Sequence, residues 1–291
     1  MRNRRGFTLI EILVSLVIML IVSGAIYKML NSTQRLSRAQ AERVSLQSNI
    51  RSGALVVPTE LRELSTYLGG GVSQNDVLAV VDSTDITYRA MRGIGFICQA
   101  TATEIRLAGR NAAAPLIGYS GYRDPVAIRD SLYVFIDGDE SVAGVDAWLP
   151  LPITGVNSAS SCGGVAAIAL TIPNTPLAAQ PVRTPVRIYE NMQLQLYVNG
   201  GKSWLGAKSV STGEAFQPVL GPLTDAQGLA FQYLDAAGAT TTNLKAIKSI
   251  KVTIRGITDQ AINGGSGSSG AMSSVQDTLV SQVVLRNAFR P

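Results

Sequence analysis

A long apolar run opens the pattern of hydrophobic and polar positions. It extends from Phe7 to Leu30, and Glu11 is its only charged residue before Lys28. An α-helix over these positions is about 36 Å long, which is enough to cross the roughly 30 Å hydrocarbon layer of a bilayer. Arginines precede the run, so the positive-inside rule keeps the amino end in the cytoplasm. The pattern predicts a transmembrane helix over residues 7–30, with the rest of the chain on the other side.

A second apolar pattern predicts that this helix continues over residues 31–68. Apolar residues recur at steps of three and four, at Leu46, Ile50, Ala54, Val57, Leu61, Leu64 and Leu68. This spacing forms one stripe of a helix that packs on other structure. Pro58 removes a hydrogen bond and crowds the preceding turn, so we expect a kink or break between Ala54 and Pro58. Gly69-Gly70-Gly71 predicts the end of the helix.

Beyond position 71 the pattern changes to the short runs and alternation of β-strands. The expected strands cover 86–91, 132–136, 165–172, 192–198, 229–235, 246–258 and 275–285. Asn199-Gly200-Gly201 predicts a hairpin turn into 202–208, and the glycine- and serine-rich stretch 264–270 predicts a flexible loop. Few helical patterns separate the strands, which favours an antiparallel sheet. We therefore expect an α+β fold, in which the long helix packs on a β-rich region at 72–291. Within it, 111–184 is a candidate insertion or second lobe.

Glu11 is the unusual residue of the apolar run. A carboxylate at membrane depth costs several kcal/mol unless it is protonated or paired. One interpretation places Glu11 near the headgroups, where its side chain reaches water. The other requires cleavage after Gly6, which creates a cationic amine at Phe7. That amine can meet Glu11 four residues along the same helix, or Glu11 of a neighbouring subunit in a staggered assembly.

One segment near the start of the chain resembles the class III signal of type IV pilins and type II secretion pseudopilins. It reads Arg4-Arg5-Gly6-Phe7-Thr8-Leu9-Ile10-Glu11-Ile12-Leu13-Val14. The resemblance implies that a prepilin peptidase recognises Gly6 and Phe7, removes residues 1–6 as a leader, and methylates Phe7. It also implies that Glu11 directs assembly. The expected partners are major and other minor pilins or pseudopilins and an inner-membrane assembly platform. The subunit would wait in the inner membrane and then join a filament in the periplasm or at the cell surface.

The carboxy-terminal part adds a looser resemblance. Gly228 to Asp235, the strand from Lys248 to Arg255 and the closing Val284-Leu285-Arg286-Asn287 are similar to the end of larger minor pilins of the PilW type and minor pseudopilins of the PulJ type. The implied function is that of a minor pilin that promotes filament assembly, with a role in DNA uptake, adhesion or motility. Two alternatives stay open. One is a minor pseudopilin of type II secretion, and the other is a membrane-tethered periplasmic enzyme with an uncleaved anchor.

The composition limits the chemistry of the region beyond the anchor. Its two cysteines, Cys98 and Cys162, are expected in an oxidising compartment, where a disulfide would stabilise the fold by roughly 3–4 kcal/mol. The alternative is a pair of buried thiols. The chain has no histidine, so the commonest general base and the commonest transition-metal ligand are absent. No serine or carboxylate stands in a recognisable catalytic pattern, and we expect the protein not to be an enzyme.

Two acidic residues are candidate calcium ligands. Asp137 and Asp139 lie in the segment Asp137-Gly138-Asp139-Glu140, and hard oxygen ligands suit this cation. The spacing of the familiar twelve-residue calcium loop is missing, however, and Asp-Gly pairs are common in ordinary turns. We expect no other cofactor.

Three basic residues are candidate contacts for DNA phosphates. Lys251 and Arg255 share one face of an expected strand, and Lys245 precedes it. The alternative is a solvated strand face on which lysine discourages edge pairing. Net charge adds little, because removal of the three leader arginines lowers it from +5 to 5 − 3 = +2. The segment Gly200-Gly201-Lys202-Ser203 resembles the end of a phosphate-binding loop, but Leu196 stands where that loop requires glycine, which favours the hairpin.

Overall fold

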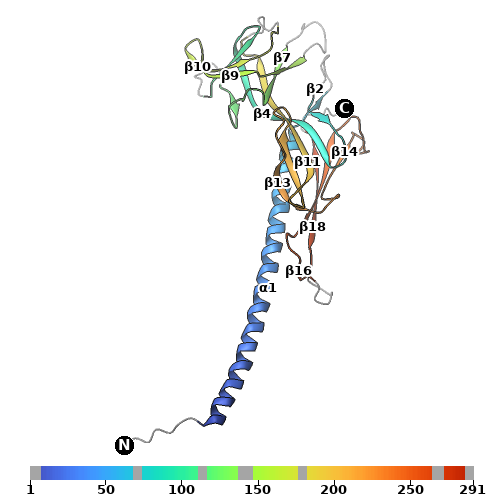
Figure 1. Cartoon of the computed structure of the whole chain (residues 1–291). Helices are drawn as coiled ribbons and strands as arrows, with labels where there is room; N and C mark the ends of the chain where they lie inside the picture. Colours follow the sequence, from blue (N-terminus) through green and yellow to red (C-terminus); the bar gives the residue numbers. More distant parts are fainter. Residues whose placement is uncertain are drawn as a thin grey trace, which may run out of the picture. The chain divides into compact units, whose positions relative to one another are not determined.

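The computed structural model describes residues 8–67, 74–110, 117–136, 147–175, 182–263 and 272–285. In this part of the chain one helix, α1 (Leu9–Arg62), is followed by β-strands (Figure 1). The strand pairs whose register is described are all antiparallel. The predicted α+β class is therefore confirmed. The chain divides into two compact units, one of Met1–Ser48 with Ile257–Asp277 and one of Asn49–Gly256 with Thr278–Pro291.

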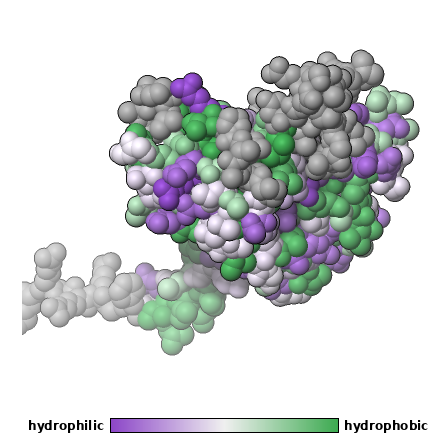
Figure 2. All heavy atoms as spheres, turned by 90° about the horizontal axis from the view of Figure 1, so that it is seen from above, coloured by the Kyte–Doolittle hydropathy of each residue, from purple (hydrophilic) through white to green (hydrophobic). Residues whose placement is uncertain are grey.

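The amino-terminal part of α1 is long and apolar enough to cross a membrane. None of its most apolar stretch is buried by the rest of the described chain. Leu13, Ile18 and Leu20 are examples of its exposed side chains. Figure 2 shows hydrophobic residues clustered at the start of α1. Since large apolar side chains in one continuous patch avoid water, this exposure indicates a lipid environment.

The helix passes through Pro58 and ends at Arg62. The helix therefore does not break at Pro58, and the alternative of a kink there stays a prediction. The predicted extension of the helix to position 68 is wrong. One turn before the proline, the carbonyl of Leu55 accepts a hydrogen bond from the Thr59 hydroxyl at 2.6 Å. The carbonyl that loses its N–H partner to Pro58 is a different one, that of Ala54, four residues before the proline.

The helix ends where backbone groups of the following residues form hydrogen bonds with other parts of the chain. The Ser65 N–H donates to the Asp76 carboxylate at 2.7 Å. Strand β1 (Thr66–Tyr67) then pairs with β2 (Gln74–Asn75). The predicted terminator Gly69-Gly70-Gly71 lies outside the described residues.

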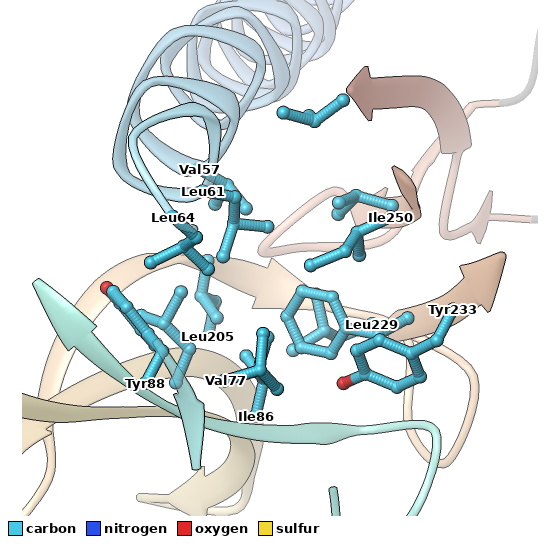
Figure 3. Packing of buried hydrophobic residues seen from close by; sticks show 14 of the residues in the cluster. Val57, Leu61, Leu64, Val77, Ile86, Tyr88, Leu205, Leu229, Tyr233 and Ile250 are labelled. Atoms are coloured by element: carbon cyan, nitrogen blue, oxygen red, sulfur yellow. The ribbon is translucent and has the colours of Figure 1, made fainter. Parts of the chain in front are cut away.

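The predicted apolar stripe is buried along its described length. Leu46, Ile50, Val57, Leu61 and Leu64 are each at most 6 % exposed, and Ala54 is partly buried. Figure 3 shows the last three of the buried residues above the side chains of the sheet. From Val57 onward the stripe thus packs the carboxy-terminal turns of α1 into the hydrophobic core of the β-rich unit, to which these turns belong.

Two long neighbouring strands form the centre of the β-rich unit. β4 (Asp85–Ala100) pairs with β11 (Pro185–Asn199), and the main sheet runs in the order β14-β15-β13-β12-β11-β4-β5-β10-β9. The other strands are β3 (Val77–Ala79), β5 (Glu104–Ala108), β6 (Ser120–Gly121), β7 (Asp130–Ile136), β8 (Ala147–Pro152), β9 (Gly155–Cys162), β10 (Val165–Thr171), β12 (Lys202–Ser209), β13 (Gln217–Leu223), β14 (Leu229–Leu234), β15 (Ser249–Ile257) and β18 (Gln276–Val284). Each strand that we predicted falls within one of these elements or overlaps it closely.

The predicted hairpin joins β11 to β12. Gly200 and Gly201 have φ angles of 61° and 74°, which a two-residue turn of this kind requires at both positions. The segment Gly200-Gly201-Lys202-Ser203 is therefore a hairpin turn, as the missing glycine at Leu196 indicated.

Two hydrophobic clusters fill the β-rich unit. The first joins the end of α1 to β14 and β15, with Leu61, Phe231 and Ile250 among its members. The second, which includes Leu107, Leu132 and Ile168, lies among β5, β7, β8 and β10. The described part of the stretch 111–184 supplies β6 to β10. It thus builds much of a second core.

A small sheet and a helix contact organise the other unit. β16 (Ile262–Asn263) pairs with β17 (Met272–Ser273), and the Thr258 N–H donates to the carbonyl of Val275 at 2.9 Å. The Glu42 carboxylate of α1 accepts hydrogen bonds from the backbone N–H groups of Asp259 and Gln260, at 2.9 and 3.3 Å. This returning segment is thereby held to the helix. The predicted loop 264–270 lies outside the described residues.

Candidate functional site

The first turn of α1 carries Glu11, the charged residue of the apolar run. Its N–H donates to the carbonyl of Thr8 at 3.1 Å, and the Ser15 hydroxyl donates to its carbonyl at 2.7 Å. The residue is exposed, and within the described ranges its carboxylate forms no ion pair. Gly6 and Phe7 lie outside the described residues. The Glu11 carboxylate therefore lies on an apolar helix and has no ion-pair partner among the described residues.

Residues 1–27 match the family model of the prokaryotic N-terminal methylation motif. This motif supports a type IV pilin-like or pseudopilin precursor. The matched residues include the arginines, Gly6, Phe7 and Glu11 on which the sequence resemblance depends, so that resemblance is confirmed. Neither a curated protein nor a solved structure gives a significant match. The prepilin-type motif implies processing by prepilin peptidase, assembly with other pilins, and anchoring in a membrane by the amino-terminal helix.

The two cysteines form the predicted disulfide. Cys98 of β4 is bonded to Cys162 at the end of β9, with 6.1 Å between their Cα atoms. The bond joins the central strand β4 to the outermost strand of the sheet order. It closes a loop that contains much of the second hydrophobic cluster.

The candidate DNA contacts are only partly brought together. β15 buries Ile250, Val252 and Ile254, while the alternating Lys251, Thr253 and Arg255 are partly exposed, as predicted. The guanidinium of Arg255 donates to the Gln227 side chain at 2.8 Å.

The neighbours of β15 correct one interpretation. β15 pairs with β13, β14 and β18, so it is an internal strand and its lysine does not guard a free edge. Lys245 lies before β15, beside a surface hollow of about 480 Å³ that Arg89 also lines. DNA binding stays a prediction.

The candidate calcium ligands Asp137 and Asp139 lie outside the described residues. Among the residues that the structure does describe, no group of three or more acidic, cysteine or histidine side chains is arranged to hold a metal ion. Calcium binding stays a prediction as well.

A buried ion cluster is the feature that sequence reasoning missed. Glu190 of β11 has a 2 % exposed side chain. Its carboxylate accepts hydrogen bonds from Arg92 at 2.8 Å, from Arg123 at 3.2 Å and from Arg129 at 2.6 Å. Burial raises the pKa of Glu190, but the hydrogen bond and charge of Arg92, together with the hydrogen bonds of Ser209 and Arg129, leave the pKa below its ordinary value. The carboxylate is therefore held in its ionised form.

The cluster extends in three directions from Glu190. Arg123 also binds the fully buried Asp130 carboxylate through two nitrogens, and this hydrogen bonding raises the pKa of Arg123. Arg129 reaches Glu214 at 3.2 Å. Arg92 reaches Glu60 of α1 at 3.5 Å. The described carboxylates of the cluster are all paired with arginine, so its chemistry is that of a structural connection between α1, β4, β7 and β11.

One sequence signal for this cluster existed. Val186, Ile188 and Glu190 alternate along β11 and are all buried, so an acid occupies an inward-facing strand position. A buried acid requires a cationic partner. Nothing in the spacing showed that Arg92, 98 residues earlier, would supply it.

Proposed function

We propose that this chain is a minor pilin, a structural subunit that prepilin peptidase processes after Gly6 and that promotes assembly of a type IV pilus. The observation that carries the proposal is the exposed Glu11 on an apolar helix, within a match to the N-terminal methylation motif. After cleavage, the amine of Phe7 would neutralise Glu11 of a neighbouring subunit. Pairing of the two charges makes helix association favourable in lipid, where each charge alone is costly.

The β-rich unit supports a structural role. Its described interior contains two hydrophobic clusters and an ion cluster whose carboxylates are paired with arginine. The chain has no histidine to act as a general base. We therefore infer that the protein is a substrate of the peptidase and not itself an enzyme. A contribution to DNA uptake, adhesion or motility would come from the surface of this unit.

Two other functions compete with this proposal. A minor pseudopilin of type II secretion shares the same motif and anchor. Deletion of the gene would then stop secretion of folded proteins and leave pili intact, whereas loss of a minor pilin reduces piliation. A membrane-tethered enzyme would need no cleavage, and its anchor would remain joined to Met1.

The decisive experiment is mass spectrometry of the amino terminus of the protein purified from membranes. A chain that begins at methylated Phe7 supports a filament subunit. A chain that still begins at Met1 or Arg2 overturns the proposal. A Gly6→Ala variant serves as the control, because it should accumulate uncleaved and stay out of the sheared filament fraction.

A further inference from the structure

A basic segment of α1 follows the apolar run directly. Between positions 28 and 43 the chain carries Lys28, Arg35, Arg38 and Arg43 and a single acid, Glu42, which gives a net charge of 4 − 1 = +3. All four cations are exposed. In the described part of the chain, none of them has a carboxylate within ion-pair distance.

The single acid of the segment has other partners. The Glu42 carboxylate binds the backbone N–H groups of Asp259 and Gln260. It therefore gives the neighbouring Arg38 and Arg43 little compensation. The charge of the segment is left to an anion from outside the described chain.

Three of the four cations, all except Arg38, share a surface with polar side chains. A hollow of about 610 Å³ along this part of α1 is lined by residues that include Tyr27, Lys28, Asn31, Arg35 and Arg43. Arg35 and Arg43 follow Lys28 by about two and about four helical turns, so the three side chains lie on one side of the helix. Hydrogen-bond donors and positive charge thus line one continuous surface.

The position of the segment identifies the anion. Arg35 lies about 7.5 Å and Arg38 about 12 Å beyond Leu30 along the helix axis. The headgroup region adds roughly 5–7 Å to each side of the hydrocarbon layer, and a long arginine side chain can reach back toward it. Lys28 and Tyr27 sit at the end of the apolar run, where such residues commonly contact headgroups.

We propose that this segment binds the phosphodiester headgroups of anionic phospholipids in the outer leaflet of the membrane that α1 spans. The inference rests on the anchored orientation of the proposed function. Four cations on this side oppose the orientation that Arg2, Arg4 and Arg5 favour. Neutralisation by lipid phosphate removes that conflict. It also holds the subunit at a defined depth before it enters a filament.

Native mass spectrometry of the full chain, released from micelles that contain equal amounts of phosphatidylglycerol and phosphatidylcholine, tests the proposal. The wild-type chain should retain phosphatidylglycerol preferentially. Each cation near an anionic surface contributes about a fivefold preference, so the double variant Arg35→Gln/Arg38→Gln should lose roughly 25-fold. The matched control, Arg51→Gln/Arg62→Gln, removes two exposed arginines of α1 that lie far beyond the headgroups and should retain the preference.

Three outcomes overturn the proposal. The first is equal retention of both lipids by the wild-type chain. The second is a loss of lipid preference in the Arg51→Gln/Arg62→Gln control as large as that in the Arg35→Gln/Arg38→Gln variant. The third is an unchanged lipid preference in the Arg35→Gln/Arg38→Gln variant, combined with poor entry into filaments. The last result would assign the segment to an acidic surface of another subunit. Lipid preference together with an uncleaved Met1 terminus would instead support the lipid site and reject the pilin function. Release of the chain from membranes by alkaline carbonate would reject the anchor on which both depend.

Discussion

Arg92 and Glu190 form a buried ion pair between the two central strands, with 2.8 Å between Nε of Arg92 and Oε2 of Glu190. The register between β4 and β11 shifts where Ile188 opposes Gly93 and Tyr189 opposes Met91, which leaves Arg92 as the extra residue of a β-bulge. A bulge redirects the side chain of the inserted residue. Here it accompanies the contact of Arg92 with Glu190 and with Glu60 of α1.

The first prediction concerns this pair. Glu190→Ala should lower the free energy of unfolding by about 3–5 kcal/mol, because three arginines lose a buried partner. Chemical denaturation of the full chain in detergent micelles measures the change. Glu104→Ala is the matched control, since its pair with Arg106 is about one third exposed on each side and should contribute at most about 1 kcal/mol. Equal losses in the two variants would show that the buried cluster is not stabilising.

The second prediction concerns Asp76, which is 4 % exposed beside the end of α1. Burial raises the pKa of its carboxyl to about 6, against the charge of Arg187 and the hydrogen bond from Ser65. In the unfolded chain the pKa of an Asp is about 3.9, so the folded state binds the proton more tightly between these values. The free energy of unfolding should therefore fall as pH rises from about 4 to about 6, by on the order of 3 kcal/mol.

Asp76→Asn should flatten the pH dependence in that window and make the chain more stable than wild type at pH 7.5. Denaturation midpoints of both proteins across pH 4–8 provide the comparison. Asp124→Asn, a change at a half-exposed carboxylate, is the control and should follow the wild-type curve. An unchanged slope in the Asp76 variant would mean that this carboxyl titrates normally.

The third prediction concerns the disulfide. Its partners are 64 residues apart, so the Cys98→Ala/Cys162→Ala variant should lose about 4 kcal/mol through the larger entropy of its unfolded chain. Reductant should destabilise the wild-type chain by a similar amount and leave the variant unaffected. Hydrogen exchange should rise in β9 and β10 more than in β14 and β15, because β9 carries Cys162 and β10 pairs with β9. A uniform change would contradict this assignment.

The fourth prediction concerns Glu42 and the segment that it holds. Glu42→Ala removes the acceptor of the Asp259 and Gln260 N–H groups, so hydrogen exchange at residues 257–263 should increase about tenfold. Glu42→Gln keeps a side-chain oxygen at the same reach and should restore most of the protection. If both variants exchange like the wild type, the contact does not hold the segment to α1.

The fifth prediction concerns assembly. Glu11→Gln keeps the size of the side chain and removes its charge, so it should still be cleaved but enter the sheared filament fraction at about a tenth of the wild-type level or less. Immunoblots of filament and membrane fractions measure the ratio. Glu63→Gln, which removes an exposed carboxylate just past the end of α1, should assemble normally. Normal incorporation of the Glu11 variant would reject charge pairing as the cause of assembly.

Several local features were predictable because each depends on neighbours in sequence. The alternation in β15, the paired glycines before β12 and the apolar stripe of α1 all appear as expected. The end of α1 was misplaced by six residues. The Asp76 carboxylate accepts a hydrogen bond from the Ser65 N–H, and the helix ends before the glycines that we predicted as its terminator.

The amino-acid order alone determined the membrane helix, the prepilin-type motif and the α+β class, because hydrophobic periodicity and short motifs act through residues close along the chain. It also limited the cysteines to one pairing. Only the tertiary structure decided that β15 is internal, that Arg92 reaches Glu190, and that Glu42 holds a segment more than 200 residues away. The first two depend on strand order and on a bulge, and the burial that strengthens the Arg92–Glu190 pair exists only when distant strands meet. The third depends on the return of the chain to α1 after β15.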